Sequence, residues 1–69
     1  MTAPHPIVTA LVAHRKRIGM TQVSVGRRIH MAGSGMSMLE SGQRRPAVDT
    51  LAAYAEVVGL RLTLVKVPE

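Results

Sequence analysis

Apolar side chains recur every three or four residues along most of the chain, a spacing typical of short amphipathic helices. The pattern predicts four helices, over residues 7–18, 22–29, 32–41 and 48–58. Gly19, Gly42 and Gly59 follow three of them at the position where a helix commonly ends. Thr21 precedes the second helix as its N-cap. The residues expected to face a common core include Ile7, Leu11, His14, Arg15, Ile18, Val25, Ile29, Met36, Leu39, Val48, Leu51, Ala55 and Val58.

The pattern changes after Gly59, where apolar and polar residues alternate as in a β-strand. The predicted strand covers residues 60–67 and ends before Pro68. No other segment of the sequence predicts a strand, so this one needs a partner chain or is a frayed tail. We expect it to pair with a second copy of the chain through Leu60, Leu62, Thr63 and Leu64, with the three leucines lying over the core near the fourth helix.

Positive charge is concentrated in the middle of the sequence. The chain has nine Lys and Arg against four Asp and Glu, a net charge of +5. Between residues 14 and 45 only Glu40 opposes Arg15, Lys16, Arg17, Arg27, Arg28, Arg44 and Arg45. Solubilising charge alone could explain the total. The uneven distribution is more typical of a surface that binds a polyanion such as nucleic acid.

Composition argues against several other classes of protein. There is no cysteine, hence no disulfide and no thiolate. The three histidines, His5, His14 and His30, lack the spacing of metal ligands, so we expect no metal and no cofactor. Glu40 has no second catalytic group paired with it by motif, which argues against an enzyme. No apolar run approaches the roughly 20 residues that span a membrane, and we expect a cytoplasmic protein. At 69 residues the core is small, which favours stabilisation by oligomerisation.

A tight connection between the second and third predicted helices carries a more specific signal. Gly26 falls where the two helices must touch, and the third ends in Leu39-Glu40-Ser41-Gly42. With Thr21-Gln22, Pro46 and the spacing of Leu51, Ala55 and Gly59, residues 7–59 resemble the Cro/cI-type helix-turn-helix family, also called the XRE family. The resemblance implies a mainly α fold, a single DNA-binding domain of four helices over residues 1–69, with the dimerisation strand at its C-terminus.

The resemblance also implies roles for individual residues. In this family the second helix of the motif enters the DNA major groove. The matching base-facing positions are Gly33, Ser34, Ser37 and Met38, and the matching phosphate-contacting positions are Gln22, Gln43, Arg44 and Arg45. Arg15 and Glu40 match a salt bridge between the first and third helices. The family usually has glycine where His30 stands, because the backbone there is left-handed, and usually has Ser or Thr at the N-cap, where this chain has Ala32.

Two functions follow as expectations. The first is a homodimeric transcriptional repressor that binds an imperfectly palindromic operator in double-stranded DNA and blocks a promoter. The second is an antitoxin that binds a toxin protein and regulates its own operon. Antitoxins of this fold usually carry further sequence after the strand, where this chain has Pro68 and Glu69, which favours the repressor. A membrane-active cationic peptide is disfavoured, because the arginines do not oppose one continuous apolar helix face.

Overall fold

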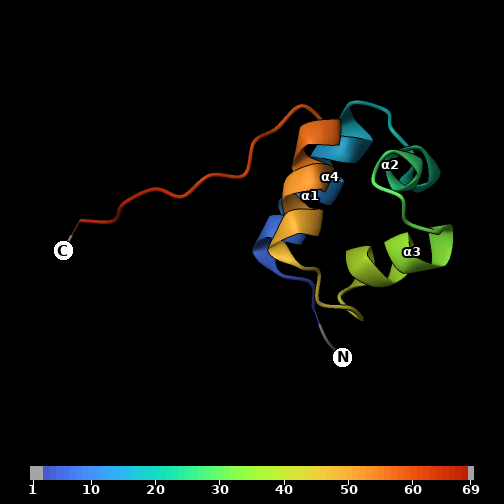
Figure 1. Cartoon of the computed structure of the whole chain (residues 1–69), viewed down its shortest axis with the longest axis horizontal. Helices are drawn as coiled ribbons and strands as arrows, with labels where there is room; N and C mark the ends of the chain where they lie inside the picture. Colours follow the sequence, from blue (N-terminus) through green and yellow to red (C-terminus); the bar gives the residue numbers. More distant parts are fainter. Residues whose placement is uncertain (1–2, 69) are drawn as a thin grey trace.

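The computed structural model describes residues 3–68, and over this range the fold is helical. Figure 1 shows the four helices, α1 (Pro6–Arg17), α2 (Gln22–Arg28), α3 (Gly33–Ser41) and α4 (Val48–Val57). Every predicted helix is present, and each boundary lies within one residue of the predicted one. The helices α1 and α2 each pack against both α3 and α4.

Two of the four helices begin with a side-chain cap. Thr21 Oγ1 accepts a hydrogen bond from the Ser24 N–H at 3.1 Å, which confirms the predicted N-cap of α2. His5 Nδ1 accepts one from the Ile7 N–H at 3.1 Å at the start of α1, a cap that the sequence pattern does not reveal. In contrast, α3 and α4 begin after Ala32 and Ala47, whose side chains cannot accept. Both helices therefore depend on tertiary packing for part of their stability.

The core lies among all four helices. Its buried apolar residues are Val8, Leu11, Val25, Met36, Leu39, Tyr54, Ala55 and Val58. The predicted face of α1 was partly wrong, because Val8 is buried whereas Ile7 and Ile18 are 36% and 47% exposed. Successive helical residues are about 100° apart, so the face that contains Leu11 and Arg15 takes Val8 and turns Ile7 outward. Val48, in the first turn of α4, is likewise exposed rather than buried.

The turn between α2 and α3 is unusually close-packed. A Cβ atom on Gly26 would lie 2.7 Å from the Met31 carbonyl oxygen and 3.0 Å from Met36 Cγ, so only glycine fits there. The Met31 N–H donates to the Gly26 carbonyl at 2.7 Å and closes the turn. His30 has φ +60°, which confirms the left-handed backbone predicted at this position. A non-glycine residue tolerates that conformation at a modest free-energy cost, and His does so better than most.

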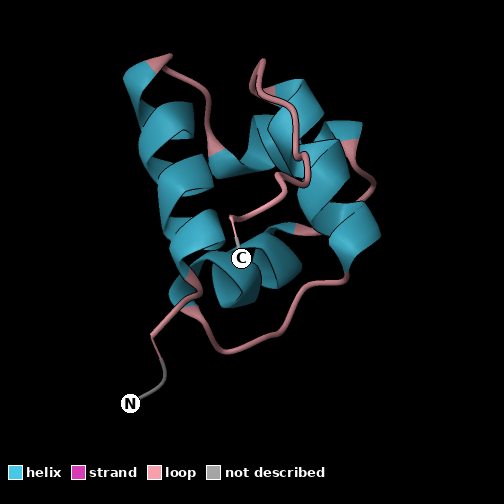
Figure 2. Cartoon of the chain, turned by 90° about the vertical axis from the view of Figure 1, so that its left-hand side faces the viewer, coloured by secondary structure: helices cyan, strands magenta, loops and turns pink. Residues whose placement is uncertain are grey.

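The C-terminal segment is extended but forms no strand. In Figure 1 it leaves the helical body after α4, and Figure 2 shows it as loop throughout. Residues 3–68 contain no other strand that could supply its backbone hydrogen bonds, so the predicted strand over 60–67 is not formed within this chain. The expectation that Leu60, Leu62 and Leu64 cover the core was wrong in part: Leu62 is half-buried, Leu60 is 38% exposed and Leu64 is fully exposed. No helix within residues 3–68 is long and apolar enough to span a membrane.

The two methionines of α3 provide a test of the orientation of this helix. Met36 is fully buried and Met38 is 42% exposed. We expect Met36→Ala to lower the free energy of unfolding by about 2–5 kcal/mol, because it leaves a cavity in the core. Met38→Ala is expected to change it by no more than about 0.5 kcal/mol. Urea denaturation followed by circular dichroism measures both values, and the reverse order of the two variants would mean that α3 is rotated.

Candidate nucleic-acid interface

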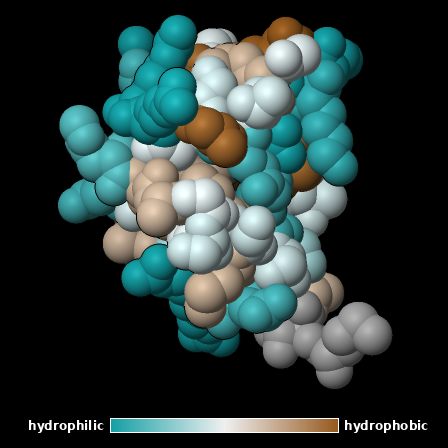
Figure 3. Space-filling view, turned by 90° about the vertical axis from the view of Figure 1, so that its right-hand side faces the viewer, coloured by the Kyte–Doolittle hydropathy of each residue, from teal (hydrophilic) through white to brown (hydrophobic). Residues whose placement is uncertain are grey.

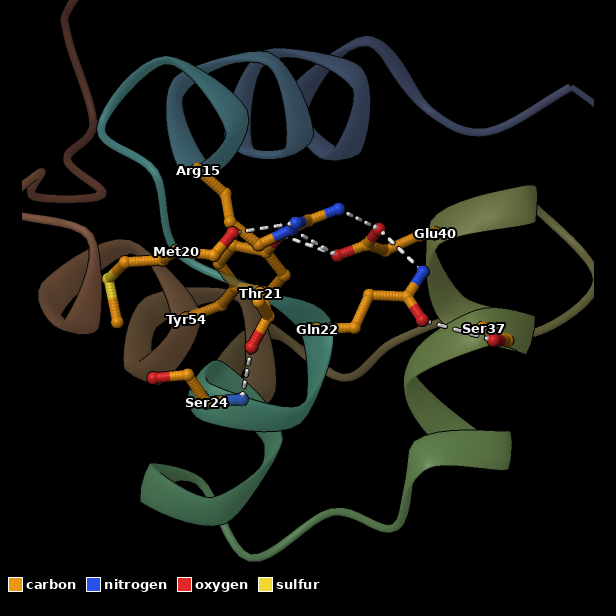
Figure 4. Close-up of polar contacts among 8 residues, drawn as sticks. All are labelled: Arg15, Met20, Thr21, Gln22, Ser24, Ser37, Glu40 and Tyr54. Atoms are coloured by element: carbon orange, nitrogen blue, oxygen red, sulfur yellow. Dashed lines mark hydrogen bonds and ion pairs between the residues drawn. The ribbon is translucent and has the colours of Figure 1, made fainter.

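A buried carboxylate, that of Glu40 near the end of α3, connects the helices beneath the candidate interface. Arg15 donates to it twice, from Nε to Oε2 at 2.9 Å and from Nη2 to Oε1 at 2.8 Å. The Tyr54 hydroxyl donates to Oε2 at 2.7 Å. Figure 4 shows how these side chains converge from α1, α3 and α4. The Arg15 and Glu40 side chains are only 8% and 7% exposed, so both charges depend on this pairing.

Further hydrogen bonds extend the cluster to the start of α2 and onto the surface. Arg15 Nη1 donates to the Met20 carbonyl at 2.8 Å, and Arg15 Nε also donates to the Tyr54 hydroxyl at 3.1 Å. Gln22 Nε2 donates to Glu40 Oε1 at 3.0 Å, and Gln22 Oε1 accepts from the Ser37 hydroxyl at 3.2 Å. Within residues 3–68 no buried side-chain nitrogen or oxygen lacks a hydrogen-bond partner. The cluster therefore links α1, α2, α3 and α4 through polar contacts that are fully satisfied.

These contacts change the acidity of the groups involved. Burial raises the pKa of the Glu40 carboxyl, but the hydrogen bonds from Arg15, Tyr54 and Gln22 together outweigh it, and the net result is a lowered pKa. Burial, followed by the hydrogen bond to Glu40, raises the pKa of Tyr54. The hydrogen bond to Glu40 raises the pKa of Arg15 against the opposing effect of burial. At neutral pH the cluster thus holds one carboxylate, one guanidinium and a neutral phenol that donates a hydrogen bond to the carboxylate.

The side of α3 opposite the core is open to solvent. All four expected base-facing residues, Gly33, Ser34, Ser37 and Met38, are exposed. Their side chains are not equally free to make new contacts, because the Ser37 hydroxyl is hydrogen-bonded to Gln22 whereas the Met38 side chain makes no polar contact. Figure 3 views the molecule from the side where α2 and α3 lie, and there hydrophilic atoms border a paler, less polar centre.

Three of the four expected phosphate-contacting residues lie in the loop after α3. Gly42 ends the helix with φ +87°, and the N–H groups of Gln43 and Arg44 both donate to the Met38 carbonyl, at 3.0 and 3.2 Å. Gln43, Arg44 and Arg45 are all exposed. The two arginines line a groove between the first turn of α3 and the start of α4, together with His30, Ser34 and Thr50.

The fourth expected phosphate contact, Gln22, lies apart from this loop. Its amide is bonded to Glu40 and Ser37, so the structure places it between the buried cluster and the outer side of α3. Sequence reasoning did not find Tyr54, the third partner of the buried pair. A usable signal was present, since Tyr54 stands three residues after Leu51 and four before Val58, on the expected core face of α4.

Two short helices joined by a tight turn, the second exposed along one side and held on the other, define a helix-turn-helix motif. The family model described as "Helix-turn-helix domain" matches residues 8–66. The chain belongs to this family, a finding that agrees with the resemblance to Cro/cI-type proteins. Comparison with curated proteins and with solved structures gives no significant match.

The lowered pKa of Glu40 predicts how stability depends on pH. The folded protein binds this proton less readily than the unfolded chain, in which the pKa is close to 4.5. The stabilisation from Glu40 is therefore complete above about pH 5 and is lost as pH falls through the lower folded-state pKa. Glu40→Gln, which leaves the Arg15 charge buried without its partner, is expected to destabilise the protein by about 3–5 kcal/mol at pH 7, and by progressively less on acidification.

The measurement is the urea unfolding free energy of wild type and variant between pH 7 and pH 3. Glu56→Gln is the matched control, because the Glu56 side chain is 66% exposed and lies 3.9 Å from Arg61 in a surface ion pair. Such pairs contribute little, so this variant should resemble wild type at every pH. A wild-type advantage over Glu40→Gln that stays constant down to pH 3 would contradict the expected linkage.

Proposed function

We propose that the chain is a homodimeric transcriptional repressor that binds double-stranded DNA with α3 in the major groove. The observation that carries the proposal is the two-sided environment of α3. Its inner side is fixed by Met36, Leu39 and the buried Glu40 cluster, while its outer side is open and the loop after the helix carries Arg44 and Arg45. A rigidly mounted, solvent-exposed helix beside exposed arginines is the arrangement that groove docking needs.

The proposed division of labour follows from the side chains. Ser34 and Ser37 offer hydroxyls that can donate to or accept from base edges, and Met38 offers apolar contact with a thymine methyl. Gly33 presents only backbone, which permits close approach to the groove. Because no side chain on the outer side of α3 forms bidentate base contacts, phosphate contacts should supply most of the affinity. We propose that the phosphate contacts on either side of the DNA major groove are made by Gln22, Gln43, Arg44 and Arg45.

The proposed dimer rests on the C-terminal segment. It is extended, alternates in sequence and leaves Leu64, Val65 and Val67 at least 76% exposed. Antiparallel pairing of two such segments would satisfy their backbone groups and bury part of this apolar surface. Related by a two-fold axis, two α3 helices would enter successive major grooves about 34 Å apart. The operator is then an imperfect palindrome, and occupancy would occlude a promoter.

The exposed apolar segment also keeps the second candidate function open. An antitoxin would use the same residues to bind a toxin protein and would bind its operator with the same helix. The oligomeric state of the chain alone in solution and on DNA separates the two candidates.

The first test concerns the phosphate contacts. An operator is selected from a random pool of duplex DNA, and affinity is measured at a series of salt concentrations. Arg44→Ala with Arg45→Ala should weaken binding to all sequences alike and reduce the slope of log affinity against log salt by about 0.9 for each phosphate that the variant no longer neutralises. The control is Arg61→Ala with Lys66→Ala, which removes the same charge from the C-terminal segment and should leave most of the slope intact.

Two results would count against the proposal. If the wild-type protein enriches no duplex sequence and binds none, the chain is not a DNA-binding repressor. If the two double variants change the slope equally, the loop after α3 is not the phosphate-contacting surface.

The second test concerns the dimer. Thr63→Pro removes a backbone N–H from the middle of the proposed strand, while Thr63→Val keeps the donor and the β-branched shape. We expect the proline variant to sediment as a monomer and to lose most of its affinity for a full palindrome, and the valine variant to remain dimeric. Analytical ultracentrifugation and titration with full and half operators measure both properties. A wild-type protein that stays monomeric at micromolar concentration and on DNA would contradict the dimer and favour the antitoxin.

A further inference from the structure

Two glycines in the first turn of α3 have different surroundings. A Cβ atom added at Gly33 would meet nothing within 4 Å. At Gly35 the same atom would lie 3.3 Å from Arg44 Nη1 and 3.3 Å from Met31 Cε. Separations of that size are tighter than nine in ten real Cβ contacts, so an alanine at Gly35 would shift both neighbours by a few tenths of an ångström. The bare backbone at Gly35 therefore makes room for the Arg44 guanidinium.

The backbone of Arg44 is fixed at the other end of the same helix. Its N–H donates to the Met38 carbonyl at 3.2 Å, within the left-handed turn at Gly42. From there the Arg44 side chain runs toward Gly35, which precedes Met38 by three residues, or about 4.5 Å along the helix axis. Arg44 is thus held to α3 by a backbone hydrogen bond to Met38, and its guanidinium lies close to the space that a side chain at Gly35 would occupy. Its charge lies beside Ser34 and Gly35, along the groove between α3 and α4.

We propose that Gly35 is a positioning residue for the phosphate contact of Arg44. This inference rests on the proposed DNA-binding function. An arginine side chain loses rotational freedom when it binds a phosphate, and that loss reduces affinity. A guanidinium already seated against the recognition helix loses less. Gly35 acts through Arg44 and touches no nucleotide itself.

The test is a double-mutant cycle with an internal control. Gly35→Ala and Gly33→Ala make the same chemical change in the same helix, and alanine raises helix propensity at both positions. The affinity of each for the selected operator is measured in the wild-type and Arg44→Ala backgrounds. We expect Gly35→Ala to weaken binding by about 2- to 10-fold, the effect of ordering one rotamer-rich side chain. We expect Gly35→Ala to add no further loss once Arg44 is alanine, whereas any loss caused by Gly33→Ala, at a proposed base-facing position, should be the same in both backgrounds.

The salt dependence gives a readout that a purely structural effect would not move. Without an ordered phosphate contact the slope of log affinity against log salt is smaller, so the slope of Gly35→Ala should fall toward that of Arg44→Ala. Circular dichroism should show at least wild-type helix content in both glycine variants.

The inference is overturned if Gly35→Ala and Gly33→Ala show the same coupling to Arg44→Ala. It is also overturned if Gly35→Ala weakens binding equally in the Arg44→Ala background, since displacement of Met31 would then be the cause. Either result leaves the proposed function intact, whereas a wild-type protein without duplex binding removes both.

Discussion

The carboxylate of Glu40 is the constraint on which the rest of this small structure depends. A buried negative charge is strongly destabilising unless opposite charge and hydrogen bonds surround it. Here the donors come from three other parts of the chain, Arg15 in α1, Gln22 in α2 and Tyr54 in α4. Satisfying this one group therefore fixes the relative positions of all four helices. An apolar contact could tolerate some sliding, but the bidentate Arg15–Glu40 geometry does not.

This constraint explains how a weak helix can serve as the proposed recognition element. The sequence of α3 begins Gly-Ser-Gly and has no side-chain cap, so the isolated segment would have little tendency to be helical. Its order comes from its inner side, where Met36 and Leu39 are buried and Glu40 is held. The outer side of α3 then contributes little to stability, so small residues can occupy it without loss of the fold. The same freedom lets the backbone at Gly35 accommodate a side chain from the following loop.

The sequence predicted the helices well because local signals and periodicity agree at each of them. Glycines with positive φ end the helices at Gly42 and Gly59, and Thr21 caps α2 as expected. The face of α1 was less predictable, since Ile7 and Val8 are both apolar and only tertiary packing selects between them. Tyr54 was missed for a related reason, because its role lies in a hydroxyl that reaches a carboxylate on another helix. The candidate recognition residues came from resemblance to a family, and periodicity alone could only show that they share an outward side.

Strand formation by the C-terminal segment cannot be predicted from a single chain. Alternation of Leu60, Leu62 and Leu64 is a property of the sequence, but a strand is a property of a pair, because its backbone groups need a neighbour. In the helical body every buried side-chain polar group within the described residues has a hydrogen-bond partner. The segment after Gly59 is different, because it leaves apolar side chains in solvent, and Leu64 is fully exposed. Burying one such side chain contributes about 1.5–3 kcal/mol, while a domain of this size gains only about 3–5 kcal/mol from its core. Association through this segment would therefore be comparable in free energy to folding itself, so that in a dimer the two processes would be coupled. The spacing of two recognition helices on DNA would then depend on the stretch of chain that contributes least to the monomer.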